Sequence, residues 1–284
     1  MARAVSARNV ARVRVAAVQL TSTPDRARNL AIVGELIDGA ADAGAAFVAL
    51  PELFNGWGSA AQLREGAEAL DGPTLTWVRQ RAVRHQLWLL AGSIVERVEG
   101  RDRFRNTSCL VAPDGALAAV YRKIHLFDVS VEGFAYQESA TVLPGEEIMV
   151  AEAGPLTVGM SICYDLRFPE QFRIMALRGA TVVTLPSAFT APTGKDHWEP
   201  LVRARAIENQ VFVIAPDQWG ASTERLQWHG RSMIVDPWGV VLAQAPDRDC
   251  FITADLDLEA QTDIRTRLPS LANRRPETYD WPAE

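Results

Sequence analysis

The sequence predicts an α/β fold in which two β-sheets pack face to face and helices cover their outer faces. Short apolar runs alternate with helix-like stretches along the chain, and two segments of the first half recur in the second half. With 284 residues, of which 48% are hydrophobic and 23% charged, the chain has the composition of a globular protein with a sizeable core.

The first half predicts strands and helices in alternation. Residues 13–20 form an apolar, strand-like run, and Pro24 is expected to open a helix at its first position that ends near Gly44. The elements that follow are a strand at 46–50, a helix starting at 72–73, strands at 88–95 and 107–111, and a turn at 113–115.

The second half begins after a long stretch, 122–143, that shows no clean periodicity. Such a stretch in a compact domain is more often functional than idle. The elements predicted after it are a strand at 156–163, a helix at 169–179, a helix that starts with a capping box of Asp196 and Glu199, and a strand at 250–254.

Two pairs of segments resemble each other across the halves. GAAFVALPELF at 44–54 matches GATVVTLPSAF at 179–189, and LVAPDG at 110–115 matches IVDPWG at 234–239. The alternative is chance similarity between strand-and-turn segments. Because no linker separates the halves, we expect one domain at 11–270 with an internal duplication, followed by a tail at 271–284.

Charge and cysteine content exclude several classes of protein. A net charge of -6 gives no basic field for nucleic acid or an anionic membrane, and no apolar run reaches the roughly 18 residues of a membrane span. Three cysteines are too few for a disulfide framework, so we expect a reducing, cytoplasmic setting.

Cys163 differs from the other two cysteines. Cys109 and Cys250 lie in strand-like runs and are expected to be small buried side chains. Cys163 ends a predicted strand just before a helix, where backbone N–H groups are expected to lower the pKa of its thiol. It is therefore a candidate nucleophile, with a core cysteine as the alternative.

Three charged residues are candidates to act with a nucleophile. Glu52 follows an apolar strand, so we expect it to be buried and suited to act as a general base. The alternative is a carboxylate that caps the turn at 54–58. Lys123 is one of only two lysines in an arginine-rich chain and is flanked by apolar residues, which makes it a candidate for the site. The alternative is an ordinary snorkelling lysine. Glu138 lies in the aperiodic stretch, where a solvated acid is the alternative.

The sequence supports no metal site and no nucleotide cofactor. The histidines at 85, 125, 197 and 229 show no metal-ligand spacing, and there is no glycine-rich phosphate loop or nucleophile-elbow serine.

Three segments together resemble the carbon–nitrogen hydrolase, or nitrilase, superfamily. They are LPELF at 50–54, YRKIHLF at 121–127 and GMSICYDLRFPE at 159–170, which hold Glu52, Lys123 and Cys163 in the order of that family. The resemblance covers nearly the whole chain and implies a four-layer α-β-β-α sandwich. It also implies assembly into dimers or higher homo-oligomers, with the tail at an interface.

The resemblance further implies a reaction. Cys163 would attack an amide carbon, Glu52 would take the thiol proton and later activate water, and ammonia and then the acid would leave through a thioester. Lys123 and the backbone N–H of Tyr164 would stabilise the oxyanion. Glu138 would hold Lys123 charged and oriented.

The residues after the cysteine resemble amidases more than true nitrilases, since Tyr164 and Asp165 stand where nitrilases have Trp and Glu. The branch most similar contains the ω-amidases and deaminated glutathione amidases, which implies a terminal amide of a small carboxylate as substrate. Arg167 would then bind the carboxylate, or else pair with Asp165 or Glu170. Substrate contacts are also implied at the following residues: Tyr164, Trp57 (where relatives often have Tyr), Phe189 and Thr190.

Other functions stay open at this point. They are another carbon–nitrogen hydrolase specificity (aliphatic amide, N-carbamoyl compound or nitrile), a Cys-His hydrolase using His125 or His197, and a non-catalytic member that binds a partner on the same scaffold.

Overall fold

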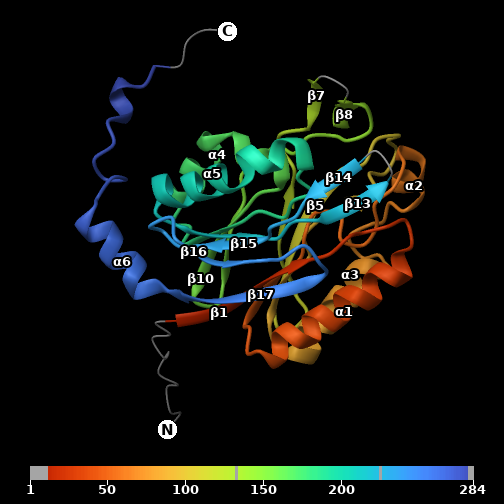
Figure 1. Cartoon of the computed structure of the whole chain (residues 1–284), viewed down its shortest axis with the longest axis horizontal. Helices are drawn as coiled ribbons and strands as arrows, with labels where there is room; N and C mark the ends of the chain where they lie inside the picture. Colours follow the sequence, from red (N-terminus) through yellow and green to blue (C-terminus); the bar gives the residue numbers. More distant parts are fainter. Residues whose placement is uncertain (1–11, 132–133, 224–225, 281–284) are drawn as a thin grey trace.

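The computed structural model describes residues 12–131, 134–223 and 226–280 and has the four predicted layers (Figure 1). Helices α1 (Arg26–Asp42) and α3 (Pro73–His85) cover the outer face of one sheet. Helices α4 (Pro169–Leu177) and α5 (Ala191–Asn209) cover the outer face of the other. The predicted sandwich is confirmed.

The first sheet has the strand order β17-β1-β2-β3-β5-β4, with β6 also pairing with β5. Strands β1, β2 and β3 are parallel, and the remaining pairs are antiparallel. The bounds are β1 (Arg12–Gln19), β2 (Phe47–Ala49), β3 (Trp88–Leu90), β4 (Ile94–Glu96), β5 (Arg105–Val111), β6 (Leu117–Arg122) and β17 (Cys250–Asp257).

The second sheet has the order β16-β15-β12-β11-β10-β9, in which β10, β11 and β12 are parallel. Its bounds are β9 (Val150–Ala153), β10 (Leu156–Met160), β11 (Val182–Thr184), β12 (Phe212–Ala215), β15 (Met233–Val235) and β16 (Val241–Gln244). Each sheet thus has three parallel strands followed by an antiparallel hairpin. Gly115 and Gly239 occupy the two hairpin loops at φ +84° and +86°, so the internal duplication is confirmed.

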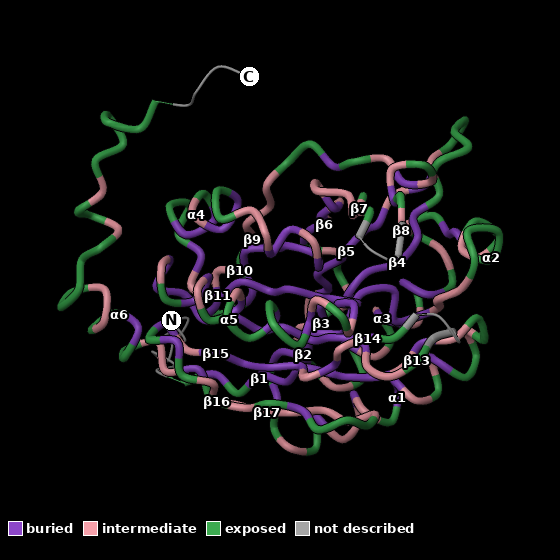
Figure 2. The backbone as a smooth tube through the Cα atoms, turned by 45° about the horizontal axis from the view of Figure 1, so that its top comes forward, coloured by how far each residue is buried: buried purple, intermediate pink, exposed green. Residues whose placement is uncertain are grey.

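Side-chain alternation along β1 shows how one strand serves two cores. Val13, Val15 and Ala17 pack between the sheets, whereas Ala16 and Val18 pack against α1 and α3. Successive strand residues point to opposite faces, so a sheet covered on both sides needs such a continuous apolar run. Figure 2 shows the buried strands at the centre and exposed helix surfaces around them.

The remaining elements surround the ends of the parallel strands or follow the body. They are α2 (Ala60–Glu65), the hairpins β7 (Asp128–Val131) with β8 (Phe134–Gln137) and β13 (Trp219–Thr223) with β14 (Leu226–His229), the 3₁₀ turns η1 (Glu138–Ala140), η2 (Cys163–Arg167) and η3 (Pro276–Thr278), and α6 (Leu258–Arg267). Beyond α6 the chain runs away from the body (Figure 1). No helix in the described ranges is long and apolar enough to cross a membrane.

Several predicted boundaries are wrong for local reasons. Helix α5 starts at Ala191, because Pro192 suits a first turn, so Asp196 and Glu199 lie inside the helix. The N-cap of α1 is Asp25, which accepts from the Arg28 N–H, and Pro24 precedes it. Two predicted strands are also shorter than expected: 88–95 divides into β3 and β4, and 156–163 ends at Met160 before η2.

Candidate active site

Cys163 lies on a strained turn at the end of β10. Its φ is +46°, which non-glycine residues rarely adopt, and its N–H donates to Pro186 O at 2.9 Å. The expected lowering of its pKa is wrong: burial and the nearby Glu52 carboxylate raise the pKa of the thiol well above its usual value. A base is therefore needed to form the thiolate.

Glu52 follows β2 and is 3% exposed. Its Oε1 accepts from Lys123 Nζ at 3.1 Å and from Asn106 Nδ2 at 2.8 Å, and its Oε2 accepts from the Ala188 N–H at 2.9 Å. The alternative role as a turn cap is wrong, because these bonds reach three other segments of the chain.

Lys123 follows β6 and is 2% exposed, so it is no snorkelling lysine. Its Nζ lies 3.1 Å from Glu52 Oε1 and 2.9 Å from Glu138 Oε2. Burial alone would lower the pKa of Lys123, but the two carboxylates outweigh it and hold that pKa well above its usual value. The side chain therefore stays an ammonium.

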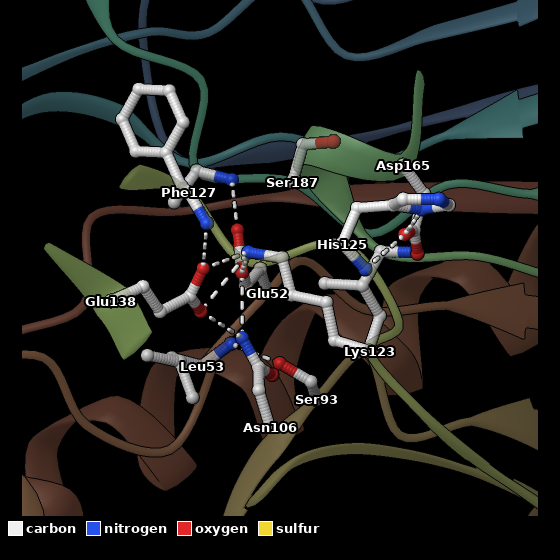
Figure 3. A network of polar contacts seen from close by, with 12 residues as sticks. Glu52, Leu53, Ser93, Asn106, Lys123, His125, Phe127, Glu138, Asp165 and Ser187 are labelled. Carbon is white, nitrogen blue, oxygen red and sulfur yellow. Dashed lines mark hydrogen bonds and ion pairs between the residues drawn. The ribbon is translucent and has the colours of Figure 1, made fainter. Parts of the chain in front are cut away.

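Glu138 is a buried acid, not a solvated one. It opens η1, is 5% exposed, and its Oε2 also accepts from the Phe127 N–H at 2.6 Å. Figure 3 shows how this bond and the two bonds to Lys123 orient its carboxylate toward Glu52. The aperiodic stretch thus supplies one wall of the site.

Two buried polar residues belong to the site although the sequence analysis did not predict them as site residues. Asn106, on β5, donates to both Glu52 and Glu138. Asp165 is fully buried and accepts from Tyr121 Oη at 2.6 Å, His125 Nδ1 at 2.7 Å and the Ile162 N–H at 2.8 Å. The acid two residues after the cysteine was an available signal, whereas Asn106 stands among other polar residues at the start of β5 and gives none.

The Asp165 contacts tie the chain around Lys123 to the turn that carries Cys163. Tyr121 and His125 stand two residues before and after the lysine. The His125 ring also stacks on Phe168, with centroids 3.6 Å apart. His125 is thus held by Asp165, and His197 contacts Arg167 instead.

The larger pocket at Cys163 encloses about 580 Å³ of space that includes its open mouth. Glu52, Lys123 and Glu138 lie on its polar side. Its apolar side includes Trp57, whose ring meets that of Trp228 edge to face at 4.5 Å between centroids. Trp57 and Thr190 therefore lie where a substrate contact is expected.

A second, smaller pocket borders the other side of Cys163. Its lining includes the remaining residues of the predicted substrate site, Tyr164, Arg167 and Phe189, and Thr190 borders both pockets. The Arg167 guanidinium carbon lies 5.3 Å from the Phe189 ring centroid, and Nη1 lies 3.3 Å from His197 Nδ1. The predicted alternative, an ion pair with Asp165 or Glu170, is not among the ion pairs of the described residues.

The other cysteines lie outside these pockets. Cys109 is fully buried, and burial raises its pKa to about 12. Cys250 is only partly buried, so the expectation of a core side chain is wrong there. Within the described ranges no three His, Cys, Asp or Glu side chains gather as metal ligands.

Comparison with known proteins agrees with this geometry. The carbon-nitrogen hydrolase family matches residues 14–266. A deaminated glutathione amidase of Synechocystis sp. is 43% identical over 91% of this chain and 97% of its own length. The omega-amidase NIT2 of Homo sapiens is 37% identical over 94% and 96%, respectively.

Solved structures share the fold. The NitFhit protein of C. elegans superposes with a TM-score of 0.91 at 36% identity, over 95% of this chain and 66% of that one. A mutant amidase of Nesterenkonia sp. AN1, with a TM-score of 0.79 at 26% identity over 96% and 98%, carries an acetamide moiety covalently added at its active site cysteine. With its motifs, layers and buried polar cluster, this chain belongs to the carbon-nitrogen hydrolase family.

Proposed function

We propose that the protein is a thiol amidohydrolase that cleaves the terminal carboxamide of a small carboxylate to the acid and ammonia. The observation that carries the proposal is the buried contact of Glu52 with Lys123 in the pocket that Cys163 also lines. A thiol whose pKa is raised by burial needs an adjacent base, and Glu52 lines the same pocket as Cys163 and raises the pKa of the thiol further.

In the proposed reaction, Cys163 Sγ bonds to the amide carbon while its proton passes to Glu52. Glu52 then gives the proton to the leaving nitrogen, the carbon–nitrogen bond breaks, and ammonia departs from a thioester. Water attacks the thioester as Glu52 takes its proton, the acid leaves, and the thiol is restored. Lys123 and the Tyr164 N–H stabilise each oxyanion, with each donor worth about 3 to 4 kcal/mol.

The proposed substrate class follows from Arg167 and from the relatives. Arg167 lines the smaller pocket at Cys163, and its Nη1 contacts His197 Nδ1 at 3.3 Å. It is thus available to a substrate carboxylate as a bidentate donor. Two relatives named deaminated glutathione amidase and omega-amidase make amides of 2-oxo acids the first compounds to test.

Assembly and compartment belong to the same proposal. The arm after α6 exposes Leu268 and Tyr279, at 51% and 58%, which supports a homodimer or higher oligomer with the tail at an interface. Three unpaired cysteines support a reducing, cytoplasmic compartment.

The test is ammonia release from a panel of ω-amides, with a charged or a neutral end and matched length. We expect carboxylate-bearing amides to react about 10- to 100-fold faster, which is the effect of one charge-assisted contact. Arg167→Met should remove this preference and leave activity on neutral amides. Equal rates on both kinds of amide in the wild type would refute the carboxylate site.

A control separates the reaction from mere binding. Intact-protein mass at low pH should show an acyl adduct in the wild type and none in Cys163→Ala, a variant that we expect to keep the fold and substrate binding. A wild type without adduct or ammonia across the panel would favour a non-catalytic binding protein.

A further inference from the structure

Four side chains at the site close a cycle of hydrogen bonds. Lys123 Nζ and Asn106 Nδ2 each donate to Glu52 Oε1, at 3.1 and 2.8 Å. The same two nitrogens donate to Glu138 Oε1, at 3.1 and 3.4 Å. Donors and acceptors therefore alternate around the cycle, which Figure 3 shows from close by.

The cycle uses only one oxygen of Glu52. The other oxygen, Oε2, accepts from the Ala188 N–H at 2.9 Å. Glu52, Ala188 and Cys163 all line the larger pocket, where burial and the Glu52 carboxylate raise the pKa of the Cys163 thiol. The oxygen left out of the cycle is thus held by the backbone of Ala188, in the pocket that Cys163 also lines.

The charges at this site explain why an amide suits the fourth position. Two carboxylates against one ammonium leave one uncompensated negative charge in a buried place, which is unfavourable without hydrogen-bond donors. The carboxamide of Asn106 is neutral and has two N–H bonds, one for each carboxylate. A hydroxyl would supply only one donor, and a second ammonium would remove the negative charge that a base requires.

The backbone fixes Asn106 relative to Lys123. The Lys123 N–H donates to Asn106 O at 2.9 Å, and Asn106 itself is 3% exposed on β5. The two donors of the cycle therefore move as one unit of the first sheet.

We propose that Asn106 is a positioning residue that holds Oε1 of Glu52 in the carboxylate form and so directs Oε2 to the Cys163 thiol. This role rests on the proposed function of Glu52 as the base. Asn106 lines the same pocket, and its Nδ2 donates to both carboxylates, so its proposed role is exerted through Glu52.

The test replaces Asn106 by Leu, which has a similar volume and no donor. Without the N–H bonds the protonated form of Glu52 gains over the carboxylate, so the acid limb of the kcat/KM profile should move up by about one pH unit. At neutral pH kcat should fall roughly 10- to 100-fold, which is the effect of one hydrogen bond to a charged group, with KM little changed. Asn106→Asp, which keeps the shape, should lose at least as much.

Asn209 gives a matched control, because it is another buried asparagine and lies on α5. Its Nδ2 donates to Arg205 O of the same helix. Asn209→Leu should leave the acid limb in place. An unchanged limb in Asn106→Leu, or an equal loss at every pH in both leucine variants, would overturn the proposal.

A second measurement needs no substrate. The rate of alkylation of Cys163 by iodoacetamide, followed by peptide mass spectrometry, should fall about 10-fold at pH 6 in Asn106→Leu and approach the wild-type rate near pH 9. If this profile shifts while the wild type hydrolyses no amide, the proposed function fails and the role of Asn106 stands. If amides are hydrolysed and neither profile shifts, only the role of Asn106 fails.

Discussion

The same strand end does different work in the two halves of the molecule. After β2 the chain reads Leu-Pro-Glu-Leu-Phe, and after β11 it reads Leu-Pro-Ser-Ala-Phe. In the first copy the side chain of Glu52 enters the site. In the second copy the Ser187 hydroxyl donates to Leu185 O, and the next residue, Ala188, supplies its backbone N–H to the site.

These two contributions meet across the interface of the halves, where the Ala188 N–H donates to Glu52 Oε2. The duplicated fold thus places two equivalent strand ends near each other, and the site depends on the different residues that follow them. One strand end supplies the carboxylate of Glu52, and the other supplies the backbone N–H of Ala188, one residue after the equivalent position.

Glu52→Gln and Ser187→Ala test this inequality most strongly. The glutamine keeps the shape of Glu52 but cannot take a proton, so ammonia release should fall about 10³-fold, within the range of general-base catalysis. Ser187→Ala removes one local hydrogen bond and should keep activity within a few-fold. Comparable losses in both variants would mean that the two strand ends are functionally alike.

Lys123→Arg is expected to have the next largest effect, a loss of about 100-fold or more in kcat, because a planar guanidinium cannot occupy the ammonium position. Lys195 is the matched control, since it is the other lysine of the chain and its side chain is 70% exposed. Lys195→Arg should retain full activity. Retention of more than about a tenth of the wild-type rate in Lys123→Arg would remove this residue from the proposed oxyanion site.

The sequence predicts the layers and the three charged or nucleophilic residues better than it predicts their environment. Repeated segments and alternating elements depend on local pattern, so both halves can be recognised. The ionisation of Cys163 depends on Glu52 and on burial, which come from a distant part of the chain. The prediction from the turn alone therefore has the wrong sign.

Asn106 and Asp165 escaped prediction for a related reason. Each has its role through partners on other strands: Asn106 through Glu52 and Glu138, and Asp165 through Tyr121 and His125. A single sequence shows the polar residue but not the partners. The boundary of α5 was missed differently, since a plausible capping box inside the helix competed with Pro192 at its start.

The smallest expected effect concerns a feature that the two halves share, the glycine that follows the first helix of each half. Gly44 and Gly179 end α1 and α4 in the same motif: their N–H groups donate to Ala41 O and Ala176 O, and the next N–H in each case reaches back to Ala40 O and Met175 O. Their φ values are +85° and +94°.

A Cβ would meet nothing within 4 Å at Gly179 and no atom closer than 3.9 Å at Gly44. The cost of Gly→Ala is therefore backbone strain alone, about 1 to 2 kcal/mol at each position. The free energy of unfolding, measured by denaturant titration, should fall by similar amounts in the two variants and additively in the double variant, with activity unchanged. A large difference between the two losses of unfolding free energy would show that the two helix ends are not structurally equivalent.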